Sequence, residues 1–144
     1  MLKKNLLNLA KYNIWSTNLI TTQLQPLKKV EIEADKNLYF MSIIGTINHL
    51  VLSEELWWCR NNNLDIKESE FSKNGKVNIT TFWSKKGAEK KDWATVIDPS
   101  QSIQAWNRVV SRWPSLIENL SEEELGKPFR YKDTSGSEFE LNRA

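Results

Sequence analysis

The stretch from Ser42 to Arg60, SIIGTINHLVLSEELWWCR, decides how this chain of 144 residues folds. Its apolar residues recur every three or four positions, the spacing that places them on one face of a helix. The pattern predicts a helix from about Leu38 to Arg60, and the asparagines at 61–63 end it because asparagine favours turns. The same helix carries the only histidine of the chain, His49, so a search for a functional site begins there.

Two further segments have helical spacing. Residues 2–25 form a long amphipathic stretch that Pro26 ends. A third helix begins at Asp98, an N-cap residue that Pro99 follows at the first helical position. Its apolar stripe runs for four turns, and Pro114 is expected to kink or restart it, because proline removes a backbone hydrogen bond. Three long amphipathic helices predict an all-α helical bundle, which would normally need a fourth helix to close its core.

The segments between the helices carry weaker signals. Residues 27–36 are charged and form a predicted connection, and residues 61–97 are the least regular part of the chain. The stretch KVNITTFW at 76–83 has the β-branched residues of a short strand, although a long loop with helical pieces fits equally well. Ser121 opens a capping box that predicts a short helical turn. Residues 129–141 predict two short extended pieces joined by a turn.

The composition indicates an ordinary globular protein with one domain, residues 1–144. Hydrophobic residues make up 40% and charged residues 26%, and the net charge is +2 because 20 basic residues are mixed with 18 acidic ones. A nucleic-acid-binding protein would gather its basic residues on one face, so we expect no nucleic-acid partner. No apolar run reaches the ~18 residues of a spanning helix, so we expect no membrane partner either.

One cysteine, Cys59, excludes a disulfide within the chain. A lone thiol fits a reducing compartment, so the expected location is the cytoplasm. No base is placed near Cys59 along the sequence, and we therefore interpret it as an unreactive, half-buried thiol.

Two groups of residues share their spacing with a known family. They are Tyr12-Asn13 and Trp15 in the first helix, and Ser42, Gly45-Thr46, Asn48-His49, Trp57 and Arg60 in the second. In this pattern the chain resembles the DinB/YfiT-like family of four-helix-bundle metal-dependent enzymes. Glu54 stands where that family commonly has an aspartate, and residues 61–97 match least. The first-helix group is expected to pack against the second helix, or else to line the mouth of the site.

The resemblance implies an up-down-down-up four-helix bundle with a divalent metal, often zinc or nickel, held by three histidines. His49 matches the histidine of the second helix. The other two form a His-x-x-x-His on the last helix, a spacing that places both side chains on one helix face. This sequence has no second histidine. We therefore expect the last helix to be truncated or missing, because either the chain is cut short or its lineage has lost the site. The metal site of this chain is then expected to be incomplete.

The resemblance also implies a function. Members of that family include thiol S-transferases and hydrolase-type enzymes, so the resemblance implies a small molecule or a thiol as the substrate. It also implies a homodimer as the assembly. The alternative is a metal-free helical binding or interaction domain, or an inactive fragment. Its binding groove would be lined by Trp15, Trp57, Trp106 or Trp113.

Three other residues of the second helix have structural interpretations. Gly45 costs roughly 1 kcal/mol relative to alanine in a mid-helix position, so its presence predicts the close approach of another helix or of a ligand. Thr46 is expected to hydrogen-bond to the Ser42 carbonyl one turn earlier. Glu54 is interpreted as a solvated carboxylate, with a salt bridge to Arg60 as the alternative.

Overall fold

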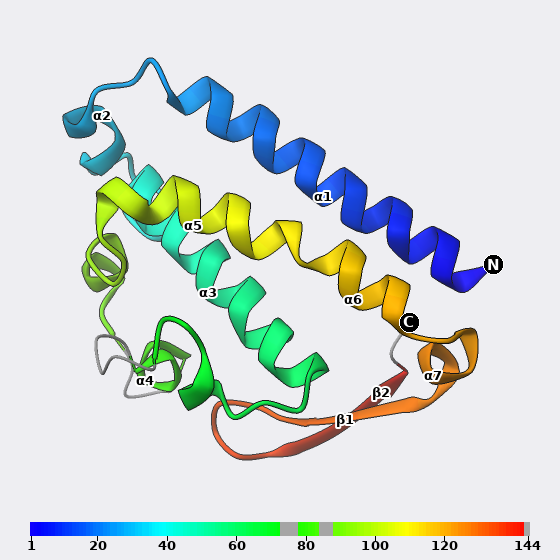
Figure 1. Cartoon of the computed structure of the whole chain (residues 1–144). Helices are drawn as coiled ribbons and strands as arrows, with labels where there is room; N and C mark the ends of the chain where they lie inside the picture. The colour runs from blue at the N-terminus through cyan, green and yellow to red at the C-terminus, as the bar shows by residue number, and fades with distance from the viewer. Residues whose placement is uncertain (73–77, 84–87, 143–144) are drawn as a thin grey trace.

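Three long helical segments and one β-hairpin make up the fold (Figure 1). This computed structural model describes residues 1–72, 78–83 and 88–142. The all-α class expected from the sequence is confirmed, with a two-stranded sheet added to it. The absence of a last bundle helix concerns residues after 142 and stays a prediction. The long segments are α1 (Leu2–Leu24), α3 (Ile43–Asn61) and α5 (Pro99–Ser111), which α6 (Trp113–Asn119) continues.

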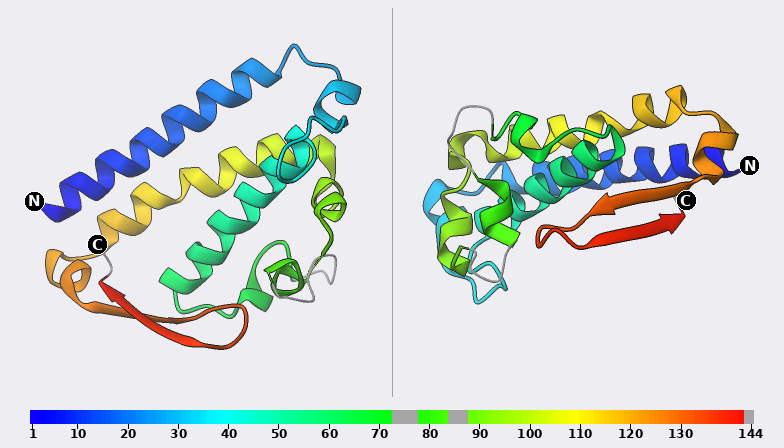
Figure 2. Two further views of the ribbon diagram at one scale, coloured as in Figure 1. Left: turned by 180° about the vertical axis from the view of Figure 1, so that it is seen from behind. Right: turned by 90° about the horizontal axis from the view of Figure 1, so that it is seen from below.

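The rod formed by α5 and α6 holds the other two long helices together. α5 packs against both α3 and α1, and α6 packs against α1. Seen from below, α5 and α6 lie in one layer, α1 and α3 in the next, and the hairpin on the far side (Figure 2). The core of this arrangement includes several nearly inaccessible side chains of α3 and α5, which are Ile47, Val51, Leu52, Ala105, Trp106, Val109 and Val110.

Helix α3 begins later than the sequence predicts. Its N-cap is Ser42, whose hydroxyl accepts the N–H of Gly45 at 3.0 Å. Before this cap the chain makes a tight turn in which Met41 N donates to Leu38 O (2.9 Å) and Met41 has a φ of 64°. That left-handed backbone prevents the helix from starting at Leu38. The expected bond from Thr46 Oγ1 to the Ser42 carbonyl is confirmed at 3.0 Å.

The third helix begins and breaks where the sequence signals predict. Asp98 is the N-cap and accepts a backbone N–H two residues ahead at 2.9 Å, with Pro99 at the first helical position. The helix stops at Ser111 and resumes at Trp113, so the restart expected from Pro114 is confirmed.

Short helices occupy the irregular connections. The strand prediction is wrong for residues 79–83, which form helix α4 (Ile79–Trp83); residues 76 and 77 lie outside the described residues. Ile79 is 1% exposed, so this β-branched side chain faces the core from a helical turn instead of from a strand. The alternative of a loop with helical pieces is therefore right. The other short helices are α2 (Lys29–Glu33), η1 (Ile66–Glu68), η2 (Lys90–Ala94) and α7 (Glu122–Gly126).

The hairpin confirms the predicted pair of extended pieces. Strand β1 (Pro128–Lys132) pairs antiparallel with β2 (Glu138–Asn142), and the register places Phe129 opposite Leu141. The capping box that precedes the hairpin is also confirmed, because the Ser121 hydroxyl accepts the backbone N–H at the third position of α7 at 3.1 Å.

Two neighbouring carboxylates on α3 tie the long helices together. Glu54 accepts hydrogen bonds from Asn13 Nδ2 of α1 (3.0 Å) and from Trp113 Nε1 of α6. Glu55 is 2% exposed and forms an ion pair with Arg112, at the junction of α5 and α6. The interpretation of Glu54 as a solvated carboxylate is therefore wrong, because folding brings two donors that are distant in sequence against it.

Helix α1 is apolar on two faces. Its inner face packs on α5 and α6 and buries Ala10, Thr17, Thr21 and Leu24. Its outer surface carries large apolar side chains that are 47% to 63% exposed, which are Leu9, Tyr12, Trp15, Leu19 and Ile20. Among the described residues, no helix combines the length and the apolar character that crossing a membrane requires.

The Glu55–Arg112 ion pair is expected to make a large contribution to stability that depends on both partners. Arg112→Met leaves the Glu55 carboxylate buried without its cation, so the free energy of unfolding should fall by about 3 kcal/mol in urea titrations. The double variant Glu55→Met/Arg112→Met should be less destabilised than the single one. Glu123→Gln, in the exposed pair with Lys127, is the control and should have little effect; equal losses for all three variants would contradict the account.

Gly45 is expected to tolerate no side chain. A Cβ at this position would lie 2.4 Å from the backbone oxygen of Phe40. The predicted close approach is therefore made by the turn before α3, and not by another helix or a ligand. Gly45→Ala should lower the free energy of unfolding by about 1–3 kcal/mol, although alanine favours helices. Gly126→Ala, whose Cβ would meet nothing within 4 Å, is the matched control and should be neutral or stabilising.

Candidate functional site

His49 lies in an aromatic environment. Its ring stacks on Phe40 with 4.1 Å between ring centroids. Two tryptophans complete the surroundings, Trp83 at 4.8 Å and Trp93 at 5.1 Å. These rings come from the turn before α3, from α4 and from η2, so three separate segments enclose the histidine.

The polar contacts of His49 leave one ring nitrogen without a partner. Nε2 lies 3.4 Å from the hydroxyl of Ser53, one turn further along α3. That hydroxyl already donates to the His49 carbonyl at 2.8 Å, so Nε2 carries the hydrogen of this contact. Nδ1 is then an unprotonated acceptor, and it is buried with no hydrogen-bond partner among the described residues. Burial also lowers the pKa of His49, which favours the neutral ring.

The described residues do not fit a divalent metal held at His49. Nδ1 offers a lone pair, but a zinc or nickel centre needs about three protein ligands. Within residues 1–72, 78–83 and 88–142, no three His, Cys, Asp or Glu side chains come together to hold a metal ion. Apart from the Ser53 hydroxyl, the groups found against the ring are aromatic, and their carbons do not coordinate these metals.

The residues of α1 that belong to the family pattern do not all contact α3. Asn13 reaches α3 through Glu54, as expected. Tyr12 and Trp15 lie against each other, with 5.5 Å between ring centroids, and are 62% and 58% exposed. The expectation that they pack against the second helix is therefore wrong. Trp106 differs from its expected role, because it is 6% exposed and belongs to the core.

Two adjoining cavities lie between the C-terminal half of α3 and the hairpin. The larger, about 370 Å³, has an apolar wall made by Leu56, Leu64 and Ile66. The smaller, about 260 Å³, is lined by Ser53, Trp57 and Trp83, among others. Both cavities share Leu56, Arg60, Asp133 and Thr134. Ser53 therefore links the His49 region to a cavity whose other wall is the hairpin.

Trp57, named from the sequence as a groove residue, lines the smaller cavity, but the other residues of these cavities were not identified from the sequence as cavity-lining. Arg60 belongs to the family pattern, and its position three residues after Trp57 is the available signal, since such residues share a helix face. Tyr131, Asp133 and Thr134 come from the hairpin, 71 or more positions further along the chain. No local pattern predicts that they meet α3.

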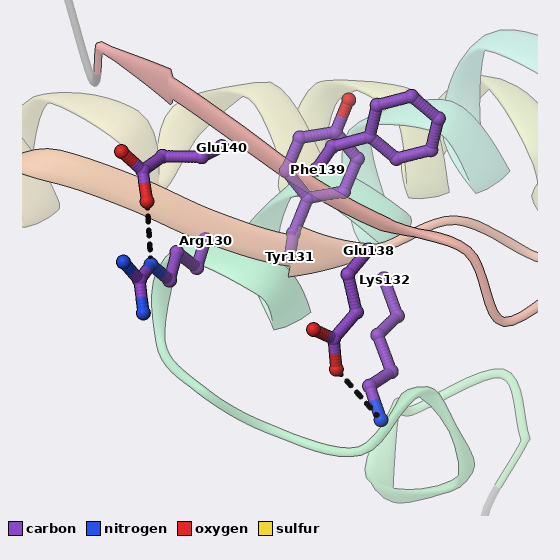
Figure 3. A pocket seen from close by; sticks show the side chains of 6 residues that line it. All are labelled: Arg130, Tyr131, Lys132, Glu138, Phe139 and Glu140. Carbon is purple, nitrogen blue, oxygen red and sulfur yellow. Dashed lines mark hydrogen bonds and ion pairs between the residues drawn. The ribbon is translucent and has the colours of Figure 1, made fainter.

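A third cavity, of about 610 Å³, surrounds the hairpin itself (Figure 3). Its charged side chains are already paired across the strands, Arg130 with Glu140 at 2.6 Å and Lys132 with Glu138 at 3.3 Å. The rings of Tyr131 and Phe139 stack on the other face of the hairpin, with 5.6 Å between their centroids. This cavity therefore presents no unpaired charge from its lining residues.

Cys59 is more deeply buried than expected, with 1% of its surface exposed. Burial, followed by the nearby Glu55 carboxylate, raises the pKa of the Cys59 thiol to about 11. The thiol is therefore almost entirely protonated near neutral pH, which agrees with an unreactive cysteine.

These features define a helical-bundle protein whose one histidine is enclosed by aromatic rings. The family model of the DinB superfamily matches residues 16–143. The chain belongs to the DinB superfamily. No curated protein and no solved structure matches it.

The buried, neutral His49 is expected to make stability depend on pH. The unfolded chain takes up a proton near the ordinary pKa of about 6.5, whereas burial lowers the pKa in the folded protein. Stability should therefore fall as the pH drops through about 6.5, and this loss should stop below the folded pKa. Urea titrations of the wild type and of His49→Phe, which keeps an aromatic ring in place, measure the effect.

His49→Phe should show a weaker dependence between about pH 7.5 and 5.5. Since the chain has no other histidine, the difference between the two proteins isolates this residue. Parallel pH profiles for both proteins would contradict the assignment.

Proposed function

We propose that this DinB-superfamily protein is a metal-free binding domain that takes a small molecule between α3 and the hairpin. The observation that carries the proposal is the environment of His49. Phe40, Trp83 and Trp93 occupy the space around the ring, where a metal centre would need further ligands.

The two cavities beside α3 support a binding role. The larger cavity lies within the range of roughly 300–1,000 Å³ that is usual for small-molecule sites. Its lining combines apolar side chains with a few polar groups, which is the composition typical of such sites. The cavities also adjoin the His49 region through Ser53, so they lie next to the residues that resemble the family pattern.

Metal loading tests the proposal. After incubation with excess zinc or nickel and gel filtration, elemental analysis should find far less than one ion per chain. Thermal unfolding should be the same with and without added metal, because an ion that binds only the folded state would raise the melting temperature. His49→Ala is the control. The metal-free proposal would be contradicted if the wild type retained one ion per chain and this variant lost it.

A metal-dependent enzyme of the thiol S-transferase or hydrolase type is the second candidate. It is favoured by one observation, the buried Nδ1 of His49 that has no partner among the described residues. For this function the additional ligands would have to come from residues outside those described or from another molecule. A stoichiometric, His49-dependent ion in the same loading experiment would support it.

We propose further that the protein forms a homodimer through the outer surface of α1. Exposed aromatic and aliphatic side chains gather there, with Tyr12, Trp15 and Leu19 on neighbouring turns. Surfaces of this kind commonly mark protein contacts.

Light scattering during gel filtration tests this interface. The wild type should be a dimer, and Trp15→Ser/Leu19→Ser should shift it towards the monomer. Val30→Ser is the matched control, because Val30 is equally apolar and 68% exposed on α2. A monomeric wild type, or a double variant that stays dimeric, would contradict the proposal.

A further inference from the structure

Arg60 packs against two aromatic rings that also contact each other. Its guanidinium carbon lies 4.7 Å from the ring centre of Trp57 on α3 and 4.6 Å from that of Tyr131 on β1. Contacts of this kind attract the cation and restrict the plane of the group. The two ring centroids are only 5.1 Å apart, so both rings lie to one side of the guanidinium, and Arg60 also lines the larger cavity.

Arg60 has no ionic partner in the part of the chain that the structure describes. None of the ion pairs found there involves Arg60, and its Nε is buried without a hydrogen bond. Burial lowers its pKa, while Tyr131 and Asp133 act in the opposite direction. The guanidinium nevertheless stays charged, since arginine does not deprotonate in proteins.

The acidic side chains that line the same cavity are engaged elsewhere. Asp133 accepts the backbone N–H groups of Ser135 (2.8 Å) and Ser137 (2.9 Å) in the hairpin turn. Asp65 accepts the backbone N–H of Lys67 at 2.9 Å, at the start of η1. These bonds hold both carboxylates on backbone donors, and neither lies within 4.0 Å of the Arg60 nitrogens.

The other basic side chains of this cavity are also engaged. Arg130 pairs with Glu140 at 2.6 Å, and Lys132 pairs with Glu138 at 3.3 Å. Of the cations that line the larger cavity, Arg60 therefore lacks a direct counter-ion among the described residues.

We propose that the larger cavity binds a small monocarboxylic acid with an apolar body, whose carboxylate lies on the edge of the Arg60 guanidinium. The edge of a guanidinium matches the two oxygens of a carboxylate. The apolar body packs against Leu56, Leu64 and Ile66. A monoanion fits better than a phosphate dianion, because Asp65 and Asp133 line the same cavity and repel additional negative charge. This inference rests on the proposed binding function and specifies its ligand class.

Four probes that each contain eight carbons test the charge preference by titration calorimetry near neutral pH. They are octanoate, octanamide, octylammonium and octyl phosphate. Octanoate should bind roughly 10- to 100-fold more tightly than octanamide, because a charge-assisted contact replaces a neutral one. Methyl NMR of the complex should show shifts at Leu56, Leu64 and Ile66.

Variants test the role of Arg60. Arg60→Gln removes the charge, and Arg60→Lys keeps a charge but cannot make the bidentate contact. Both variants should lower the affinity for octanoate by about tenfold or more. Arg60→Lys keeps the test decisive if Arg60→Gln fails to fold. Arg130→Gln, in the same cavity but paired with Glu140, is the matched control and should change affinity little.

The outcomes separate this inference from the proposed function. Octanamide or octylammonium binding as tightly as octanoate would overturn the carboxylate assignment while the binding function stands. Tighter binding of octyl phosphate, or full octanoate affinity in both Arg60 variants, would overturn it as well. If the folded protein binds none of the four probes, the inference fails; a stoichiometric zinc ion at His49 would overturn the proposed function separately.

Discussion

The fold depends on two neighbouring carboxylates of α3 that point to different partners. Glu54 joins α3 to α1 and α6 through Asn13 and Trp113, and Glu55 joins it to the junction of α5 and α6 through Arg112. A buried carboxylate is costly unless it is paired. The helices are therefore held in the register that satisfies both acids. Apolar packing alone is less specific, because it tolerates small shifts between helices more readily.

The candidate site shows that one helix does not decide the chemistry around a side chain. His49 lies on α3, but its neighbours come from the turn before the helix and from two short helices that follow. A residue pattern on one helix specifies the position and the helix face from which a side chain projects. A metal centre also needs ligands from other segments, and the segments described here bring aromatic rings instead. The place of His49 on α3 therefore does not by itself determine which groups surround its ring.

Much of the helical framework could be predicted from the sequence, because helix starts and stops are local. The proline at 114 and the cap at Asp98 act within one turn, and both were interpreted correctly. The start of α3 was misplaced because the left-handed φ of Met41 has no strong signal in a non-glycine residue. The sequence leaves a strand and helical pieces open for residues 79–83, because a buried Ile79 is compatible with either. The interpretation of Glu54 as solvated is wrong because its partners, Asn13 and Trp113, lie far away in sequence.

The link between Glu54 and Trp113 spans 59 positions of the chain, and the link between Asn13 and Glu54 spans 41. A chain emerging from the ribosome completes α1 and α3 long before residue 113 appears. Until then Glu54 has one of its two partners and Glu55 lacks its cation. The two early helices can form locally, but their mutual arrangement is secured only when the last long segment arrives. The order of synthesis therefore makes the α5–α6 junction the step that completes the bundle.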